Sequence, residues 1–166
     1  AGLGVCTISA TVAATAGYAA ASDDATFTVA AIARTLTIGG FSADGYDFDA
    51  VSKPTLTAVP VREGTTTPLT AGTTTFTVEK DSGVDVCSVN NEVGANFGKV
   101  TFITNGTCTV TAATTANTVY ASATSTQISF AIRQVTRTAA ITGYSVDGYA
   151  FDASAPTLVA TASPVD

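Results

Sequence analysis

Short runs in which hydrophobic and polar residues alternate recur along the chain, separated by glycine, proline, asparagine and aspartate. Alternation with a period of two is typical of a β-strand that buries one face. The pattern predicts strands in the middle of the chain at residues 35–41, 54–61, 73–79, 84–89, 99–104, 108–113 and 126–132. This number of short strands favours an all-β sandwich. Asn105-Gly106 predicts a tight hairpin turn with positive φ at both residues, which this pair tolerates well.

The pattern also repeats along the chain, with a shift of about 100 residues. GVCTISA at residues 4–10 returns as GTCTVTA at 106–112, and DGYDFDA at 44–50 returns as DGYAFDA at 147–153. Residues between these segments correspond as well, in the pairs Tyr18 and Tyr120, Phe27 and Phe130, and Arg34 and Arg137. Because the shift equals the usual length of an immunoglobulin-like domain, each unit is predicted to be one such β-sandwich, arranged in tandem.

The repeat divides the chain into three parts. Residues 1–32 are the C-terminal part of one unit, 33–132 are a complete unit, and 133–166 are the N-terminal part of the next. We expect the chain to be a window on a longer tandem array. A filament subunit whose incomplete ends are completed by neighbouring copies is the alternative, although the two end parts contain no equivalent of residues 65–105. The connection at 130–137 has neither glycine nor proline, which predicts a semi-rigid rod rather than a flexible tether.

Composition excludes several classes of function. Only 12% of the residues are charged and the net charge is -6, so the 7 scattered lysine and arginine residues cannot neutralise a run of phosphates. We therefore expect no nucleic-acid partner and no binding to anionic membranes. Threonine, serine or glycine interrupts every apolar stretch before the roughly 20 residues that span a bilayer, so no membrane insertion is expected in this segment. The chain has no histidine and no G-x-S-x-G or S-x-x-K motif, so we expect no enzyme activity and assign no catalytic residues.

The 3 cysteines are informative because the repeat makes Cys6 and Cys108 equivalent. Cys87 is then the partner available to Cys108, and Cys6 is expected to pair with a cysteine outside the given chain. A Cys87–Cys108 disulfide would close a loop of about 22 residues, contribute about 3 kcal/mol in the chain-entropy model and indicate an oxidising compartment. The alternatives are a free buried cysteine or a metal ligand, although the chain lacks histidine and a C-x-x-C spacing.

A family resemblance rests on the strands that carry these cysteines. VCSV at residues 86–89 is followed by GTCTVTA at 106–112, YASA at 120–123 and FAI at 130–132. This arrangement resembles the immunoglobulin-like tandem repeats of large bacterial surface and adhesin proteins. The resemblance covers the last third of the complete unit and residues 4–32. It implies an extracellular protein of the bacterial cell surface, in which such repeats act as stalks or adhesive modules.

Asp44, Asp47 and Asp49 form the main candidate for a functional site. Closely spaced carboxylates near a domain junction could bind calcium through oxygen ligands. The second copy has Ala150 in place of Asp47, and Asp-Gly and Asx turns account for these aspartates without a metal. We therefore favour turns and expect no metal or other cofactor, with calcium at the three aspartates as the alternative.

Two aromatic residues lie within the same segment. Tyr46 and Phe48 return in the second copy as Tyr149 and Phe151. We expect them to pack in the core or at the junction between units. A surface on which sugar rings stack is the alternative.

The sequence therefore predicts a structural extracellular repeat protein that forms a stalk, fibre or filament on a bacterial surface. Its expected partners are neighbouring copies of the same repeat or chain. The alternative is an adhesive module that recognises a carbohydrate or a host protein through loops at the ends of the sandwich. Binding that depends on Tyr46 or Tyr120 would favour this alternative.

Overall fold

The computed structural model describes residues 2–69 and 72–164, and every regular element within these ranges is a β-strand. The all-β prediction is confirmed. The strands in the first half of the sequence are β1 (Gly4–Val12), β2 (Ala21–Val29), β3 (Arg34–Gly39), β4 (Tyr46–Asp47), β5 (Thr57–Arg62) and β6 (Thr74–Glu79). The others are β7 (Cys87–Val89), β8 (Val100–Phe102), β9 (Gly106–Thr114), β10 (Ala123–Thr124), β11 (Ile128–Arg133), β12 (Arg137–Thr142) and β13 (Val159–Pro164).

Residues 33–132, here called the central body, are organised around β9. β6 pairs with one edge of β9, while β10 and β11 follow one another along its other edge. β4 extends this sheet by pairing in parallel with β11. β3 pairs with β5 and β7 pairs with β8 in two smaller sheets, and β3 lies against β9 and β10. Several sheets around one core are consistent with a β-sandwich, while the immunoglobulin-like arrangement stays a prediction.

The hydrophobic core lies within the central body and draws side chains from both the β9 sheet and the smaller sheets. Along β9, Cys108, Val110 and Ala112 are buried, and the residues between them are partly exposed. This is the period of two that the sequence displays. The other buried members of the core cluster are Leu36, Ile38, Leu56, Ala58, Phe76, Val86, Cys87, Val100, Phe102, Phe130 and Ile132.

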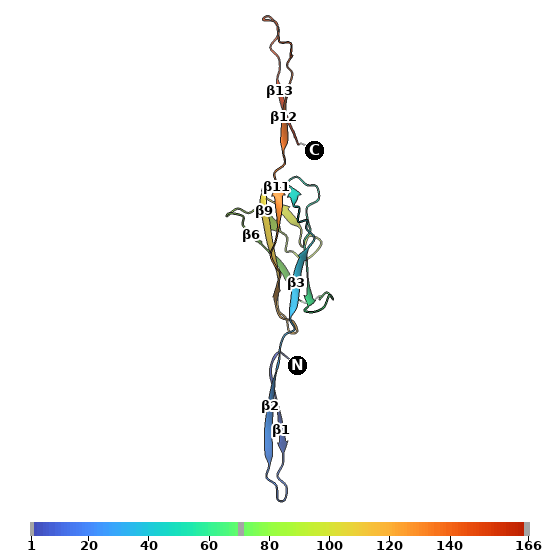
Figure 1. Ribbon diagram of the computed structural model, residues 1–166, viewed down its shortest axis with the longest axis vertical. Helices are drawn as coiled ribbons and strands as arrows, with labels where there is room; N and C mark the ends of the chain where they lie inside the picture. The colour runs from blue at the N-terminus through green and yellow to red at the C-terminus, as the bar shows by residue number, and fades with distance from the viewer. Residues whose placement is uncertain (1, 70–71, 165–166) are drawn as a thin grey trace.

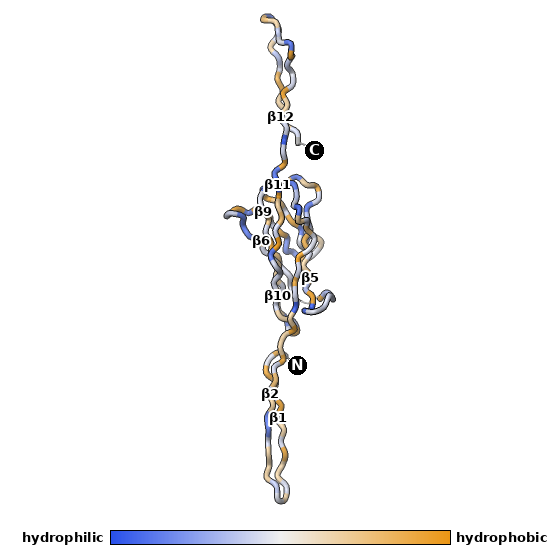
Figure 2. Tube along the Cα trace, in the orientation of Figure 1, coloured by the Kyte–Doolittle hydropathy of each residue, from blue (hydrophilic) through white to orange (hydrophobic). Residues whose placement is uncertain are grey.

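Two β-hairpins project from opposite ends of the central body (Figure 1). The N-terminal hairpin is formed by β1 and β2, and the C-terminal hairpin by β12 and β13. Every side chain described in the two hairpins is exposed, except for Cys6, which is half-buried. Hydrophobic residues nevertheless continue along both hairpins (Figure 2). The hairpins therefore present apolar side chains without a second layer to cover them.

The N-terminal hairpin reproduces the β9–β11 pair of the central body in its register. Cys6 lies opposite Phe27 in the hairpin, and Cys108 lies opposite Phe130 in the body. The sequence repeat is therefore also a repeat of strand pairing.

The C-terminal hairpin reproduces the β3–β5 pair in the same way. Ile141 lies opposite Ala160 in the hairpin, and Ile38 lies opposite Ala58 in the body. Both incomplete ends thus adopt the conformation of the corresponding part of the complete unit.

The hairpin turn predicted at Asn105-Gly106 is wrong. Gly106 has a φ of 143° and lies within β9, and Ser82, with a φ of 50°, is the one non-glycine residue of the described chain with a positive φ. The two-residue turn with positive φ at both positions is Ser82-Gly83, where Gly83 has a φ of 87° and a β-bridge joins the flanking residues 81 and 84. Asn105 ends the connection from β8, so its glycine neighbour starts a strand instead of closing a turn.

Candidate functional site

The acidic turn, residues 42–50, carries the three candidate aspartates and lies close to the exit of the chain from the central body. Within it, the Gly45 backbone N–H donates to the Ser42 carbonyl oxygen at 3.2 Å. Gly45 has a φ of 79°, and a Cβ at this position would lie 2.4 Å from the carbonyl oxygen of Ala131. Glycine at position 45 is therefore needed for the close approach of the turn to β11.

Arg133 at the end of β11 binds the acidic turn. Its Nε donates to Asp47 Oδ1 at 2.9 Å, and its guanidinium also donates to the carbonyl oxygen of Asp44. Its own carbonyl oxygen accepts a hydrogen bond from the Phe48 N–H at 2.9 Å. Sequence reasoning missed Arg133, because its contact with Asp47 joins residues 86 positions apart. Together with the β4–β11 pairing, these bonds attach the turn to the strand that leads out of the body.

The aspartates do not converge on a common point. Among the described residues, no three histidine, cysteine, aspartate or glutamate side chains form a group that could hold a metal ion. Calcium at Asp47 would also have to compete with the Arg133 guanidinium. Calcium binding by Asp44, Asp47 and Asp49 thus stays a hypothesis.

The two aromatic residues of the acidic turn have different environments. Tyr46 is half-buried, with its ring centroid 5.5 Å from that of Phe130 and 5.8 Å from that of Phe102. Its hydroxyl accepts a hydrogen bond from the Ser42 N–H at 2.7 Å. The Tyr46 ring is therefore part of the packing under the turn, whereas Phe48 is exposed.

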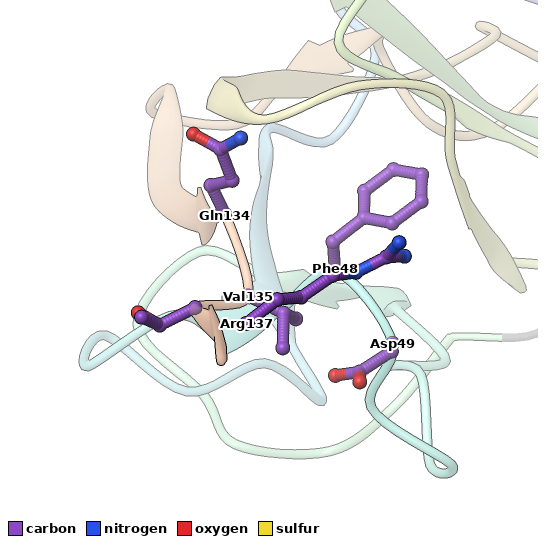
Figure 3. Close-up of a pocket in the computed structure, with 6 residues that line it drawn as sticks. Phe48, Asp49, Gln134, Val135 and Arg137 are labelled. Atoms are coloured by element: carbon purple, nitrogen blue, oxygen red, sulfur yellow. The ribbon is translucent and has the colours of Figure 1, made fainter. Parts of the chain in front are cut away.

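Phe48 and Asp49 line a hollow together with the segment that connects β11 to β12 (Figure 3). The other residues that line it are Gln134, Val135, Thr136 and Arg137. The hollow thus lies between the acidic turn and the base of the C-terminal hairpin. It combines one aromatic ring, one carboxylate and one guanidinium.

The opposite end of the central body is organised by Arg34, the first residue of β3. The Arg34 side chain is 6% exposed, and its Nε donates to the carbonyl oxygen of Ala121 at 2.6 Å. Its Nη2 donates to the carbonyl oxygen of Thr115, and the guanidinium lies 5.8 Å from the centroid of the Tyr120 ring. A buried cation needs such partners. Sequence reasoning identified Arg34 as a member of the repeat and Tyr120 as a repeat member and candidate binding residue, but it missed their contact, because nothing in the local pattern indicates it.

Cys87 and Cys108 form a disulfide, with their Cα atoms 5.6 Å apart. Both residues are buried in the core, where the bond joins β7 to β9. Cys6 has no disulfide partner among the described residues, and its pairing with a cysteine outside the chain stays a prediction.

Comparisons with known proteins do not add a family assignment. No protein-family model, no curated protein and no solved structure matches this chain. The part of the chain that the structure describes contains no helix long and apolar enough to cross a membrane. Function must therefore be inferred from the geometry of the chain.

Proposed function

We propose that the protein is a structural extracellular repeat protein, with immunoglobulin-like units joined end to end into a stalk, fibre or filament on a bacterial surface. The observation that carries this proposal is the relation of the two hairpins to the central body. Each hairpin repeats a strand pair of the body in sequence and in register, and each lies at an opposite end of it. An isolated two-stranded hairpin is only marginally stable in water, so both ends require further protein to cover them.

The connections between units support a structural role. Residues 134–136 alone separate β11 from β12, and β11 is held at this point by the bonds between Arg133 and the acidic turn. At the other connection, the Ile32 N–H donates to the Val119 carbonyl oxygen at 2.9 Å and the Ile32 carbonyl oxygen accepts from Ala121 at 3.0 Å. Both connections are therefore bonded to the body, which limits bending between units.

The disulfide supports an extracellular location. A bond between Cys87 and Cys108 persists in oxidising compartments and is rare in reducing ones. The resemblance of the cysteine-bearing strands to the tandem repeats of bacterial surface proteins supports a location on the surface of a bacterium.

Small-angle X-ray scattering of the purified chain tests the proposal. The nine residues of β1 alone extend about 30 Å, so the distance distribution should have a long tail beyond the dimensions of the central body. Arg133→Ala should broaden this tail by loosening the connection to β12. Lys80→Ala is the matched control, because Lys80 forms a similarly exposed ion pair with Asp85 away from both connections. A compact particle, or units that flex freely in the unmodified chain, would refute the structural role.

A further inference from the structure

We propose that the C-terminal hairpin of one chain docks onto the N-terminal hairpin of a second copy, so that the two incomplete ends form one joint and the chains assemble head to tail. This inference rests on the proposed structural function and names the partner. The central body is its template, because it contains both strand pairs already packed together. In the body, β3 lies against β9, and buried side chains of β3, β5, β9 and β11 belong to one core.

The apolar faces of the two hairpins correspond to the faces that meet in that core. On the N-terminal hairpin, the equivalents of the buried apolar residues of β9 and β11 are Cys6, Ile8, Ala10, Phe27 and Val29. On the C-terminal hairpin, the equivalents of the core residues Leu36, Ile38, Leu56 and Ala58 are Ala139, Ile141, Leu158 and Ala160. Ile8 is 57% exposed and Ile141 is 60% exposed, although their counterparts Val110 and Ile38 are buried. Each hairpin therefore carries one of the two apolar faces that meet between β3–β5 and β9–β11 in the body.

The polar contacts of Arg34 with Thr115, Tyr120 and Ala121 have equivalents in the two hairpins. Arg137 takes the place of Arg34, and Tyr18 takes the place of Tyr120. The carbonyl groups that accept from Arg34 in the body correspond to those of residues 13 and 19 in the loop of the N-terminal hairpin. This loop is already shaped for the contact, since the Thr15 N–H donates to the Tyr18 carbonyl oxygen at 3.1 Å, as residue 117 donates to residue 120 in the body at 3.0 Å. In the joint, Arg137 of one copy is placed to donate to this loop of the next.

A correlated difference in sequence between the hairpins and the central body indicates that the two hairpins bind each other rather than unrelated partners. In the body, Arg133 and Asp47 form an ion pair across the parallel β4–β11 contact. The equivalent of Arg133 in the N-terminal hairpin is Ala30, and the equivalent of Asp47 in the C-terminal hairpin is Ala150. Both members of the pair are replaced by alanine, although they lie at opposite ends of the chain. Mutual docking explains this, because the two alanines then face each other and neither charge is left without its partner.

The position of the hairpins determines the form of the assembly. They lie at opposite ends of the central body, so one chain cannot join its own ends (Figure 1). The contact uses different surfaces on the two copies, which is a heterologous interface and generates an open fibre when it does not close into a ring. The four hairpin strands include no equivalent of β6, β7 and β8.

Blocking one hairpin at a time tests the proposal. Ile8→Asp places a charge on the inner face of the N-terminal hairpin, and Ile141→Asp does so on the C-terminal hairpin. Ser9→Asp and Ala140→Asp are matched controls, because adjacent residues of a strand point to opposite faces. In sedimentation velocity, the unmodified chain and both controls should form a series of oligomers that lengthens with concentration. Each blocked variant alone should be monomeric, and an equimolar mixture of the two should stop at a dimer, because only one pair of intact ends remains.

The blocked variants also distinguish this contact from other modes of association. Self-association of either blocked variant alone would show contact between like ends, and a monomeric mixture would show that the intact ends do not bind each other. Either result would overturn the inference, as would an unmodified chain that stays monomeric at millimolar concentration. In all three cases, an extended particle in scattering would still support the structural function, so the two proposals fail separately.

Cys6 and Arg137 provide independent readouts of the joint. Cys6 is the equivalent of the fully buried Cys108, so its reaction with a thiol reagent should slow at least tenfold when the Ile141→Asp chain, whose N-terminal hairpin is intact, binds the Ile8→Asp chain. Arg137→Ala should raise the dissociation constant of this dimer about tenfold or more, since it removes hydrogen bonds from a charged donor. Arg62→Ala is the control, because Arg62 is exposed in the central body. Unchanged thiol reactivity, or equal effects of the two arginine substitutions, would contradict the arrangement.

Discussion

Replacing Phe130 with alanine is expected to test the core of the central body most directly. The Phe130 side chain is 2% exposed, and its ring centroid lies 6.1 Å from that of Phe41 and 5.5 Å from that of Tyr46. Removing a buried phenylalanine side chain costs about 3–5 kcal/mol, which includes the lost ring pairs and the cavity that remains. A domain of this length has a free energy of unfolding of about 5–15 kcal/mol, so Phe130→Ala should remove a large fraction of it.

Phe27→Ala is the matched control for this substitution. Phe27 occupies the equivalent position in the repeat and the equivalent register opposite Cys6, but its side chain is 50% exposed. At concentrations where the chain is monomeric, Phe27→Ala should change the unfolding of the central body by less than about 0.5 kcal/mol. Urea denaturation followed by circular dichroism and tyrosine fluorescence measures both variants. Equal losses for the two, or a loss below about 1 kcal/mol for Phe130→Ala, would refute the assignment of the core to the central body.

Further predictions concern the disulfide, Gly98 and the acidic turn. Replacing both Cys87 and Cys108 with alanine should lower the free energy of unfolding by about 3 kcal/mol, and reducing agent should lower it similarly in the unmodified chain but not in the variant. Gly98→Ala should destabilise the body by more than Gly64→Ala, although the two glycines have similar φ angles of 77° and 75°. A Cβ at the buried Gly98 would lie 2.0 Å from the carbonyl oxygen of Leu56, while the one at the exposed Gly64 meets no atom within 4 Å; thermal melts of the two variants compare them. Calcium at millimolar concentration should leave the melting temperature of the unmodified chain unchanged, and a rise that disappears when the aspartates of the acidic turn are replaced would restore the calcium hypothesis.

The alternation of apolar and polar residues predicted most of the strands of the central body, because each of the longer strands there buries one face. β6 and β9 lie within a residue or two of their predicted ranges, at residues 73–79 and 108–113. The predicted strand at 84–89 is shorter in the structure, because Val84 belongs to the Ser82-Gly83 turn. The short strands β4 and β10 were missed because two residues have no period to detect.

The candidate site was predictable only in part, and the reason is distance along the chain. The acidic turn is visible in the sequence, since its glycine and aspartates are local signals. The arginine residues that organise the two ends of the body are not, because Arg133 reaches back 86 residues to Asp47 and Arg34 reaches forward 87 residues to Ala121. The sequence repeat identified Arg34. Comparison of the copies could have indicated Arg133 as well, because Arg133 and Asp47 are both replaced by alanine in the end parts of the chain.

The disulfide between β7 and β9 also determines how the chain responds to mechanical tension. In a fibre, the pulling force enters the central body at β3 and leaves it at β11, on opposite sides of the covalent link. The residues between Cys87 and Cys108, which are 21 positions apart, are then shielded from the force, even if every strand around them has been pulled out. Because extended chain spans about 3.4 Å per residue, the link shortens the maximum extension of each unit by about 70 Å. When a fibre of such units is stretched, the unfolding of each unit therefore lengthens the fibre by less. Each unfolded unit also keeps an unstretched loop from which its core can form again.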